Sequence, residues 1–422
     1  MPLPILSTKE LEIALASNNP SRAIPLLDQR NCQEIASYFG RRCNQPELSI
    51  EELQAALNEI AKQTGKKPAV VYTLARLDQL ELMAVTPAGQ PFHIPIRGLR
   101  REQLLQTAIE FTNSVRDPRH VNTRAYLPTS QQLYQWLVAP LRPQLDAQGI
   151  ETLVFVLDSG LRSIPLAALH DGQGFLIERF NLGLVPSMSL TDRRYRNIQQ
   201  ARILAMGASE FQDLSPLPAV PLELAQITQD LGGGTQFLNA DFTIANLQRQ
   251  HNRGVYPVIH LATHAQFQPG SPKNSYIAFS DGRLNLLQLP SLRLYRPQTE
   301  LLTLSACRTA VGDLDAELGF AGLSVQLGVK SVLASLWYVS DEGTLALMTG
   351  FYHHLNTAPI KAEALRQAQL AMVRGEIRVK GSELQTIRGR IPLPAGVAKG
   401  GGDRSLDHPY FWAAFTLVGS PW

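Results

Sequence analysis

Two short runs of the sequence end in side chains that could form a nucleophile and its base. The run VIHLATHA (258–265) ends in His264 and Ala265, and the run LLTLSACR (301–308) ends just after Cys307. An imidazole close to a thiol can accept its proton or hold a thiolate, which gives a nucleophile at neutral pH. The backbone N–H groups of Ala265 and Cys307 could then donate hydrogen bonds to a developing oxyanion.

The elements that must position these side chains alternate between strand and helix from residue 201 onward. The strand-like runs are ARILAMG, YPVIHLATHA, TELLTLSAC and KSVLASLWYVSD, and helix-like runs such as AVPLELAQITQDLGGG and EGTLALMTGFYHHL separate them. Continuous apolar strands between helices are typical of a parallel sheet buried on both faces. Such sheets bind ligands at the carboxyl ends of strands that lie about 4.8 Å apart. If the two runs are neighbouring strands, His264 and Cys307 emerge side by side at that edge.

A simpler interpretation of the same residues stays open. A single cysteine and one of nine histidines can equally be core or surface residues. His260 lies mid-strand on the same face as His264. We interpret it as a buried, hydrogen-bonded residue, with a supporting role behind the site as the alternative.

Composition argues against several classes of partner. The 39 basic residues nearly balance the 36 acidic ones, and no run of five Lys or Arg occurs, so we expect no nucleic-acid partner. The start of the chain does not read as a signal peptide, and no stretch approaches the ~18 apolar residues that span a bilayer, so we expect no membrane partner. Three cysteines, Cys32, Cys43 and Cys307, are a sparse and odd set. They favour a reducing compartment without disulfides, and hence a cytoplasmic protein.

Several blocks of sequence, in order, resemble one known family. VIHLATHAQF, LLTLSACRTA and LGVKSVLASLWYVSDEGTLALMTGFYHHL are similar to the CHAT family of caspase-like and separase-like cysteine peptidases. The flanking segments LVFVLDSGLRSIPLAALHDGQGFLIERFNLGLVPSMSLT and HPYFWAAFTLVGSPW resemble the same family, so the resemblance extends over about residues 65–422. It implies an α/β fold with a caspase/hemoglobinase-like, mostly parallel sheet flanked by helices. It also implies catalysis by His264 and Cys307, with no metal and no organic cofactor.

The chain departs from the family pattern in two respects. Many relatives have glycine after the histidine, where this chain has Ala265, which slightly constrains the oxyanion loop. Family members often carry tetratricopeptide repeats, and no repeat of this kind is visible in the sequence. A separate tetratricopeptide-repeat or regulatory partner is therefore expected to recruit the protein substrate.

Two acidic residues are candidates for substrate binding. Asp341, in SLWYVSDEG, follows a strand-like run and is predicted at the same sheet edge as the Cys–His pair. Separases carry an acidic residue directly after the tryptophan of this segment, and it helps to bind a basic side chain. Here Tyr338 stands at that place, so Asp341 is the nearest candidate; alternatively, Ser340 or Asp341 caps the next helix. Glu317, in the acidic cluster GDLDAELG, could attract a basic substrate or belong to a solvated loop.

The sequence therefore predicts an intracellular cysteine endopeptidase that cleaves selected partner proteins after Lys or Arg, in regulation or signalling. A catalytically inactive caspase-like interaction module is the alternative, and a thiol-dependent transferase or ligase would use the same residues. We expect a helical region over 1–65, an accessory α+β subdomain over 66–200 and the peptidase subdomain over 201–422. The glycine-rich, basic stretch 376–408 is expected to be a mobile surface loop and a possible gate.

Overall fold

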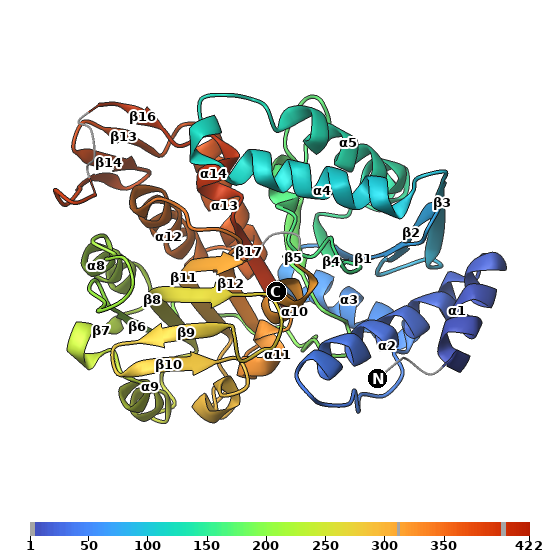
Figure 1. Ribbon diagram of the computed structural model, residues 1–422, viewed down its shortest axis with the longest axis horizontal. Helices are drawn as coiled ribbons and strands as arrows, with labels where there is room; N and C mark the ends of the chain where they lie inside the picture. The colour runs from blue at the N-terminus through green and yellow to red at the C-terminus, as the bar shows by residue number, and fades with distance from the viewer. Residues whose placement is uncertain (1–4, 310–312, 398–401) are drawn as a thin grey trace.

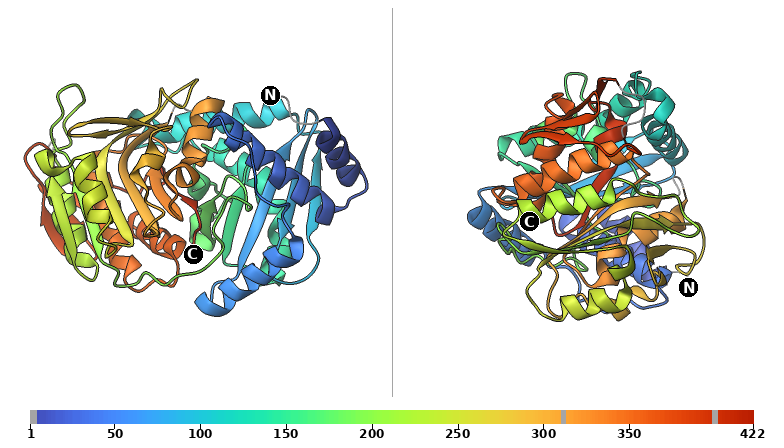
Figure 2. Two further views of the ribbon diagram at one scale, coloured as in Figure 1. Left: turned by 90° about the horizontal axis from the view of Figure 1, so that it is seen from below. Right: turned by 90° about the vertical axis from the view of Figure 1, so that its left-hand side faces the viewer.

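A sheet of thirteen strands extends through the described residues and carries helices on both faces (Figures 1 and 2). The computed structural model describes residues 5–309, 313–397 and 402–422, and the side chains of residues 5–8, 230 and 306–309 lie outside this description. Apart from strands β6 and β7, the strand order is β10-β9-β8-β11-β12-β17-β5-β4-β1-β2-β3. The expected α/β architecture, a mostly parallel sheet flanked by helices, is confirmed.

The first part of the chain builds one end of this sheet. Its helices are α1 (Ile5–Ala16), α2 (Pro20–Tyr38), α3 (Ile50–Thr64), α4 (Arg101–Arg116), α5 (Leu127–Leu137), α6 (Arg142–Ala147) and α7 (Leu176–Arg179), and its strands are β1 (Pro68–Ala75), β2 (Gln79–Val85), β3 (Phe92–Arg97), β4 (Thr152–Val156) and β5 (Asn181–Leu184). Helix α3 has the ends that its sequence predicts: the Ser49 side chain accepts a hydrogen bond from the N–H of Glu52, and Gly65 ends the helix at φ 71°. Strands β1 to β3 form the expected antiparallel meander.

The remaining strands of the sheet come from the second part of the chain. They are β6 (Ile203–Gly207), β7 (Gly234–Leu238), β8 (Val258–Phe267), β9 (Tyr276–Phe279), β10 (Gly282–Asn285), β11 (Leu301–Thr309), β12 (Ser331–Ser335) and β17 (Phe415–Gly419). The helices are α8 (Val220–Asp230), α9 (Ile244–His251), α10 (Leu314–Ala321), α11 (Leu323–Leu327), α12 (Asp341–Leu355), α13 (Lys361–Val373) and α14 (Pro409–Trp412). Strands β6, β7, β8, β11 and β12 are parallel, as expected, so their carboxyl ends share one edge.

Strand β17 joins the two parts of the sheet. It pairs antiparallel with β12 on one side and parallel with β5 on the other. At its end, Gly419 has φ +97°, and a Cβ there would lie 2.4 Å from the carbonyl oxygen of Lys330. Only glycine fits both the backbone angle and this close approach. The single sheet thus continues across residue 200, where we expect a subdomain boundary.

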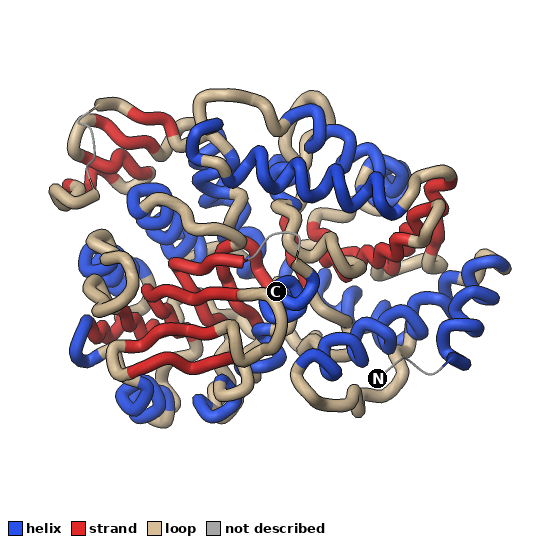
Figure 3. Tube along the Cα trace, viewed as in Figure 1, coloured by secondary structure: helices blue, strands red, loops and turns tan. Residues whose placement is uncertain are grey.

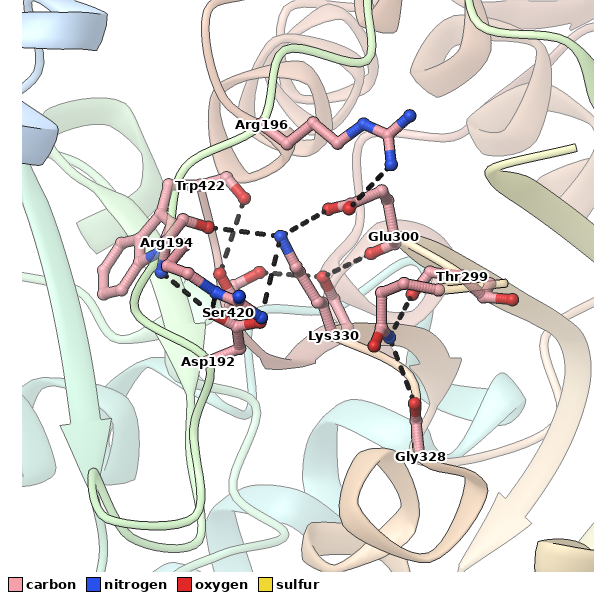
Figure 4. Close-up of polar contacts among 11 residues, drawn as sticks. Asp192, Arg194, Arg196, Thr299, Glu300, Gly328, Lys330, Ser420 and Trp422 are labelled. Atoms are coloured by element: carbon pink, nitrogen blue, oxygen red, sulfur yellow. Dashed lines mark hydrogen bonds and ion pairs between the residues drawn. The ribbon is translucent and has the colours of Figure 1, made fainter. Parts of the chain in front are cut away.

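Buried charges fix the amino-terminal edge of the same sheet (Figure 4). Lys330, just before β12, has its Nζ 3.0 Å from Oε2 of Glu300, just before β11. The same Nζ donates a hydrogen bond of 3.3 Å to the carbonyl of Arg194 and lies 3.9 Å from Oδ2 of Asp192. These contacts attach the segment after β5 to strands β11 and β12, at the edge opposite to the candidate site.

Residues 376–408 correct one expectation of the sequence. The described residues of this stretch form a small four-stranded antiparallel sheet from β13 (Arg378–Lys380), β14 (Glu383–Thr386), β15 (Gly389–Pro392) and β16 (Arg404–Ser405), drawn apart from the main sheet in Figure 3. Val379, Leu384 and Ile391 are buried along otherwise more exposed strands. This period-2 alternation is the signal of half-buried strands. The glycine and basic content obscured it, and the expectation of a loop throughout was wrong.

A disulfide between Cys32 and Cys43 corrects a second expectation. Cys32 is buried in α2, and the chain after the helix returns along it, so that the two Cα atoms lie 5.7 Å apart. The N–H of Cys43 donates a hydrogen bond to Oε1 of Gln33 on the same helix. An odd, sparse cysteine count does not exclude one bonded pair. The count therefore no longer supports a reducing compartment.

Candidate functional site

The two strands that carry the predicted catalytic residues are neighbours. Strands β8 and β11 pair in parallel, with Ala306 opposite His264 and Cys307 opposite Ala265. The register shifts by one residue after the pair of Leu304 with Leu261. Such a bulge is a common way to redirect a side chain beside a site. The structure thus brings the backbones of His264 and Cys307 to adjacent positions. The Cys307 side chain lies outside the described part of the structure, so its contact with the imidazole stays a prediction.

A short loop orients the imidazole of His264. Its Nε2 lies 2.8 Å from the backbone carbonyl oxygen of Ser215. A carbonyl only accepts hydrogen bonds, so Nε2 carries the proton, and in the neutral ring Nδ1 is the nitrogen that can accept one. The ring of Phe211 packs edge-on against the imidazole, with 4.9 Å between centroids. These contacts leave Nδ1 as the candidate base.

The loop that supplies these contacts is closed at its base. The N–H of Leu217 donates to the carbonyl of Ser209, and the Ser209 N–H donates to Oδ1 of Asn239 at the end of β7. This 209–217 loop was not among the elements predicted to form the site. A phenylalanine within the polar stretch SEFQDLSP was the available signal, because an aromatic residue in a polar loop usually packs on something specific.

His260 is buried on β8 and hydrogen-bonded, as expected. Its Nδ1 is 3.0 Å from the hydroxyl of Tyr352 on α12, and that hydroxyl donates to Oγ1 of Thr303 on β11. Its Nε2 is 2.9 Å from Oε1 of Glu223 on α8. All of these side chains are buried, and burial raises the pKa of Tyr352. These contacts link β8 and β11 to α8 and α12, four residues before His264 on β8.

Ala265 is enclosed by backbone on both sides. It lies opposite Cys307 of β11 and opposite Ile277 of β9, and it is buried. Its side chain is small enough for this position between three strands. The assignment of its N–H as an oxyanion donor stays a prediction.

Asp341 lies at the expected edge, beyond the carboxyl end of β12. It is the first residue of α12, and Ser340 is the cap, because the Ser340 side chain accepts from the N–H of Gly343. Oδ1 of Asp341 accepts a hydrogen bond of 2.9 Å from the hydroxyl of Tyr338. Burial, with the neighbouring Asp341 carboxylate, raises the pKa of Tyr338. Asp341 is half-buried beside an exposed tyrosine, so substrate binding stays a prediction that this position permits.

Glu317 occupies a different kind of position from the one expected. It lies in helix α10 and is 1 % exposed, so the alternative of a solvated loop is wrong for this residue. Its carboxylate accepts hydrogen bonds from the N–H of Gly160 (2.8 Å) and the hydroxyl of Ser163 (2.6 Å). Burial raises its pKa. In this structure Glu317 connects α10 to the turn after β4, and a substrate could reach it only if these bonds opened.

The described residues lack two features that other sites and settings would require. Among residues 5–309, 313–397 and 402–422, no group of three or more His, Cys, Asp or Glu side chains could hold a metal ion. Within those same ranges, no helix is both long and apolar enough to cross a membrane.

Comparison with known proteins identifies the family. The family model described as the CHAT domain matches residues 127–420, which is more than half of the chain. The chain belongs to the CHAT-domain family. The comparison with curated proteins found no match to this CHAT domain.

Solved structures show the fold that this CHAT domain shares. The crystal structure of the Saccharomyces cerevisiae separase–securin complex at 2.6 Å resolution matches 97% of the chain, with 12% identity and a TM-score of 0.52. A second structure of that complex, at 3.0 Å resolution, matches 98% of the chain, with 11% identity and a TM-score of 0.50. The match covers 34% of the separase-complex chain in each case, so our chain corresponds to about a third of that length. At this identity the likeness shows a separase-like, caspase-like fold.

Proposed function

We propose that this CHAT domain is a cysteine endopeptidase that cleaves selected partner proteins in regulation or signalling. The observation that supports this most is the pairing of β8 with β11, because it brings the backbones of His264 and Cys307 together at the carboxyl edge of the sheet. The contact of His264 with the Ser215 carbonyl adds to this support, since it leaves Nδ1 as the proton acceptor. A cytoplasmic setting stays a prediction from the sequence.

In the proposed reaction, Nδ1 of His264 takes the proton of the Cys307 thiol as the sulfur attacks the scissile carbonyl carbon. The carbonyl π electrons move to oxygen, and backbone N–H groups of Ala265 and Cys307 stabilise the oxyanion. Collapse of this intermediate breaks the C–N bond, and the leaving amine takes the proton from His264. Water then hydrolyses the thioester, with His264 again as base, and restores the thiol. These reaction steps need no metal or organic cofactor.

We propose that the residue before the scissile bond is Lys or Arg. Asp341 would bind its side chain, since it follows β12, the next strand after β11, at the same edge. Glu317 remains a second candidate, subject to the opening described above. Tyr338 lies beside Asp341 and is 40% exposed, so it could contact the same substrate side chain.

Regulation by a partner is part of the proposal. The separase of the comparison structures is in complex with securin, and we propose that a regulatory or tetratricopeptide-repeat partner similarly controls or recruits this chain. The β13–β16 sheet is one element that such a partner could move. The alternative is a caspase-like interaction module without activity, and transfer to an amine acceptor would indicate a transferase or ligase.

The test is labelling by an electrophilic peptide probe with arginine before its reactive group. We expect labelling of the wild type, loss with Cys307→Ala, and strong reduction with His264→Ala. The matched control is His353→Ala, since His353 is half-buried on α12, and it should label as the wild type does. Labelling that persists in Cys307→Ala, or a folded wild type that neither labels nor cleaves any candidate partner protein, would favour the interaction module.

A further inference from the structure

A groove opens beside His264 where strand β8 changes its neighbour. Along β8, pairing with β6 ends at Ala262 opposite Gly207, and pairing with β9 begins at Ala265 opposite Ile277. His264 lies between these two pairings. A sheet whose strands diverge at their carboxyl ends leaves a crevice there, which is the usual place for ligands in α/β proteins.

The groove has a volume of about 730 Å³ and extends from the 209–217 loop to the turn between β9 and β10. Phe211 lines it, and the same ring packs on the His264 imidazole, so one side chain separates the groove from the proposed base. Asn239 fixes its walls: its side-chain oxygen accepts from Ser209, and its carbonyl accepts from the hydroxyl of Ser280. The cavity is therefore built before any ligand arrives.

The side-chain charges of the groove sum to a negative value. Asp213 pairs with Arg283, whose guanidinium also lies 4.6 Å from the centre of the Tyr276 ring. Asp281 accepts the N–H of Ile244 at the start of α9. Glu210 is exposed and, within the described residues, its carboxylate has no hydrogen-bond or ion-pair partner. The groove thus offers a carboxylate that a cation can approach without displacing an existing contact.

The order of strands decides which part of a substrate would meet this carboxylate. The spatial order along the carboxyl edge is the groove, His264 on β8, Cys307 on β11 and Asp341 after β12. Strand spacing of about 4.8 Å puts β12 about 10 Å from β8, which is about three residues of extended peptide. Asp341 and Glu210 therefore lie on opposite sides of the proposed catalytic pair.

On the basis of the proposed peptidase function, we infer that this groove binds a basic side chain of the substrate on the leaving-group side of the scissile bond, with Glu210 as its partner. The protein would then select for two basic residues, one before the cut near Asp341 and one within about three positions after it. An exposed ion pair contributes modestly, so its effect is a preference in rate and not an absolute requirement.

The experiment uses the full chain and a peptide library with arginine fixed before the scissile bond. Lys, Gln or Glu is placed at each of the three following positions, and kcat/KM is measured for each peptide. We expect the wild type to prefer Lys over Glu by about three- to ten-fold at one position, and Glu210→Lys to reverse this order. The matched control is Glu52→Lys, an exposed residue of α3, which should keep the wild-type preference.

A binding measurement separates failure of the groove from failure of the peptidase. Fluorescence anisotropy of a labelled Lys peptide is measured with the Cys307→Ala protein, alone and combined with Glu210→Lys or Glu52→Lys. Weaker binding with Glu210→Lys alone, and loss of the difference at high salt, supports the groove. Equal effects of both substitutions, or no preference in the wild type, overturn it. If no peptide is cleaved, the proposed function fails, and the anisotropy result alone decides the groove.

Discussion

At the scale of single residues, the orientation of His264 depends on one short loop. The carbonyl of Ser215 accepts a hydrogen bond from one ring nitrogen, and the ring of Phe211 packs in a T-shaped contact with the imidazole. Neither contact comes from the strand that carries the histidine. The loop is a positioning element, and its effect should be visible in the rate of the chemical step more than in substrate binding.

We therefore predict that Phe211→Ala lowers kcat by about ten-fold or more, because a histidine that can rotate is in the productive geometry for less of the time. KM should change less, and Phe211→Tyr should retain most of the wild-type rate. Peptide cleavage across pH 5–9 measures this, and the shape of the profile should be kept while its height falls. A rise in KM with unchanged kcat would assign Phe211 to substrate binding alone.

A second prediction concerns the buried hydrogen bonds that join His260, Tyr352 and Thr303. Tyr352→Phe removes the hydroxyl between His260 and Thr303 and leaves buried polar atoms without a partner. The free energy of unfolding should fall by about 1–3 kcal/mol, measured by urea denaturation. Tyr276→Phe is the control: its ring stacks with Arg283 at the surface, and we expect a change within about 0.5 kcal/mol. If both variants are equally stable, the buried hydrogen bonds of Tyr352 contribute little to the free energy of unfolding.

The sequence could predict the parallel strands that carry His264 and Cys307 because each strand is a continuous apolar run, and such runs are typical of buried parallel strands. It could not predict the contacts of Ser215 and Phe211, since these join a loop to a strand 49 residues later. It also assigned Glu317 by its charge, whereas three-dimensional packing buries that carboxylate against Gly160 and Ser163. Long-range contacts of polar residues leave no periodic signal in a sequence.

At the scale of elements, the glycine-rich and basic composition of residues 376–408 led to the wrong prediction of a loop, although the alternation of apolar residues indicated strands. The β13–β16 sheet contains alternating buried residues in a glycine-rich, basic stretch, and composition alone is typical of loops. Helices and strands of the main sheet follow their patterns closely, since caps and apolar periodicity agree there. The disulfide of α2 belongs to the same class of error, because a count of cysteines contains no information on which pair is adjacent in space.

The disulfide gives a prediction at this scale. Cys32 and Cys43 are 11 residues apart. A bond that closes a loop of this length lowers the conformational entropy of the unfolded chain and so stabilises the folded state by about 2–3 kcal/mol. The double variant Cys32→Ser/Cys43→Ser should lower the free energy of unfolding by about that amount in denaturant titrations. A thiol assay on the denatured, unreduced wild type should detect one thiol, that of Cys307. Detection of three thiols would contradict the bonded pair.

At the scale of the whole molecule, the two parts of the chain share buried charges as well as a sheet. Lys361, at the start of α13, is buried, and its Nζ has no hydrogen-bond partner among the described residues. The pKa of Lys361 is lowered to about 7, chiefly by burial; nearby Lys330 also lowers it, while Glu300 and Asp192 act in the opposite direction. In the unfolded chain the same amine titrates at 10.5.

The sign of the resulting pH dependence follows from proton counts. Between about pH 7 and 10.5 the unfolded state binds more protons at Lys361 than the folded state does. The burial of Lys361 therefore lowers the free energy of unfolding more and more as the pH falls through this window, and the full effect is present below about pH 7. Lys361→Met should therefore raise Tm by several degrees at pH 6 and by less at pH 10. Lys62→Met, at an exposed site on α3, is the control and should change little at either pH. A larger gain at pH 10 than at pH 6 would contradict the assignment.

The position of β17 also has a consequence for synthesis of the chain. It is the last strand of the main sheet to leave the ribosome, yet it lies between β12 and β5, near the centre of that sheet. Until it emerges, a nascent chain exposes two unpaired strand edges, which are templates for pairing with another chain. Translation at about 5–20 residues per second leaves these edges open for seconds. A truncated product that lacks β17 should therefore associate with itself or with chaperones, whereas the complete chain should not.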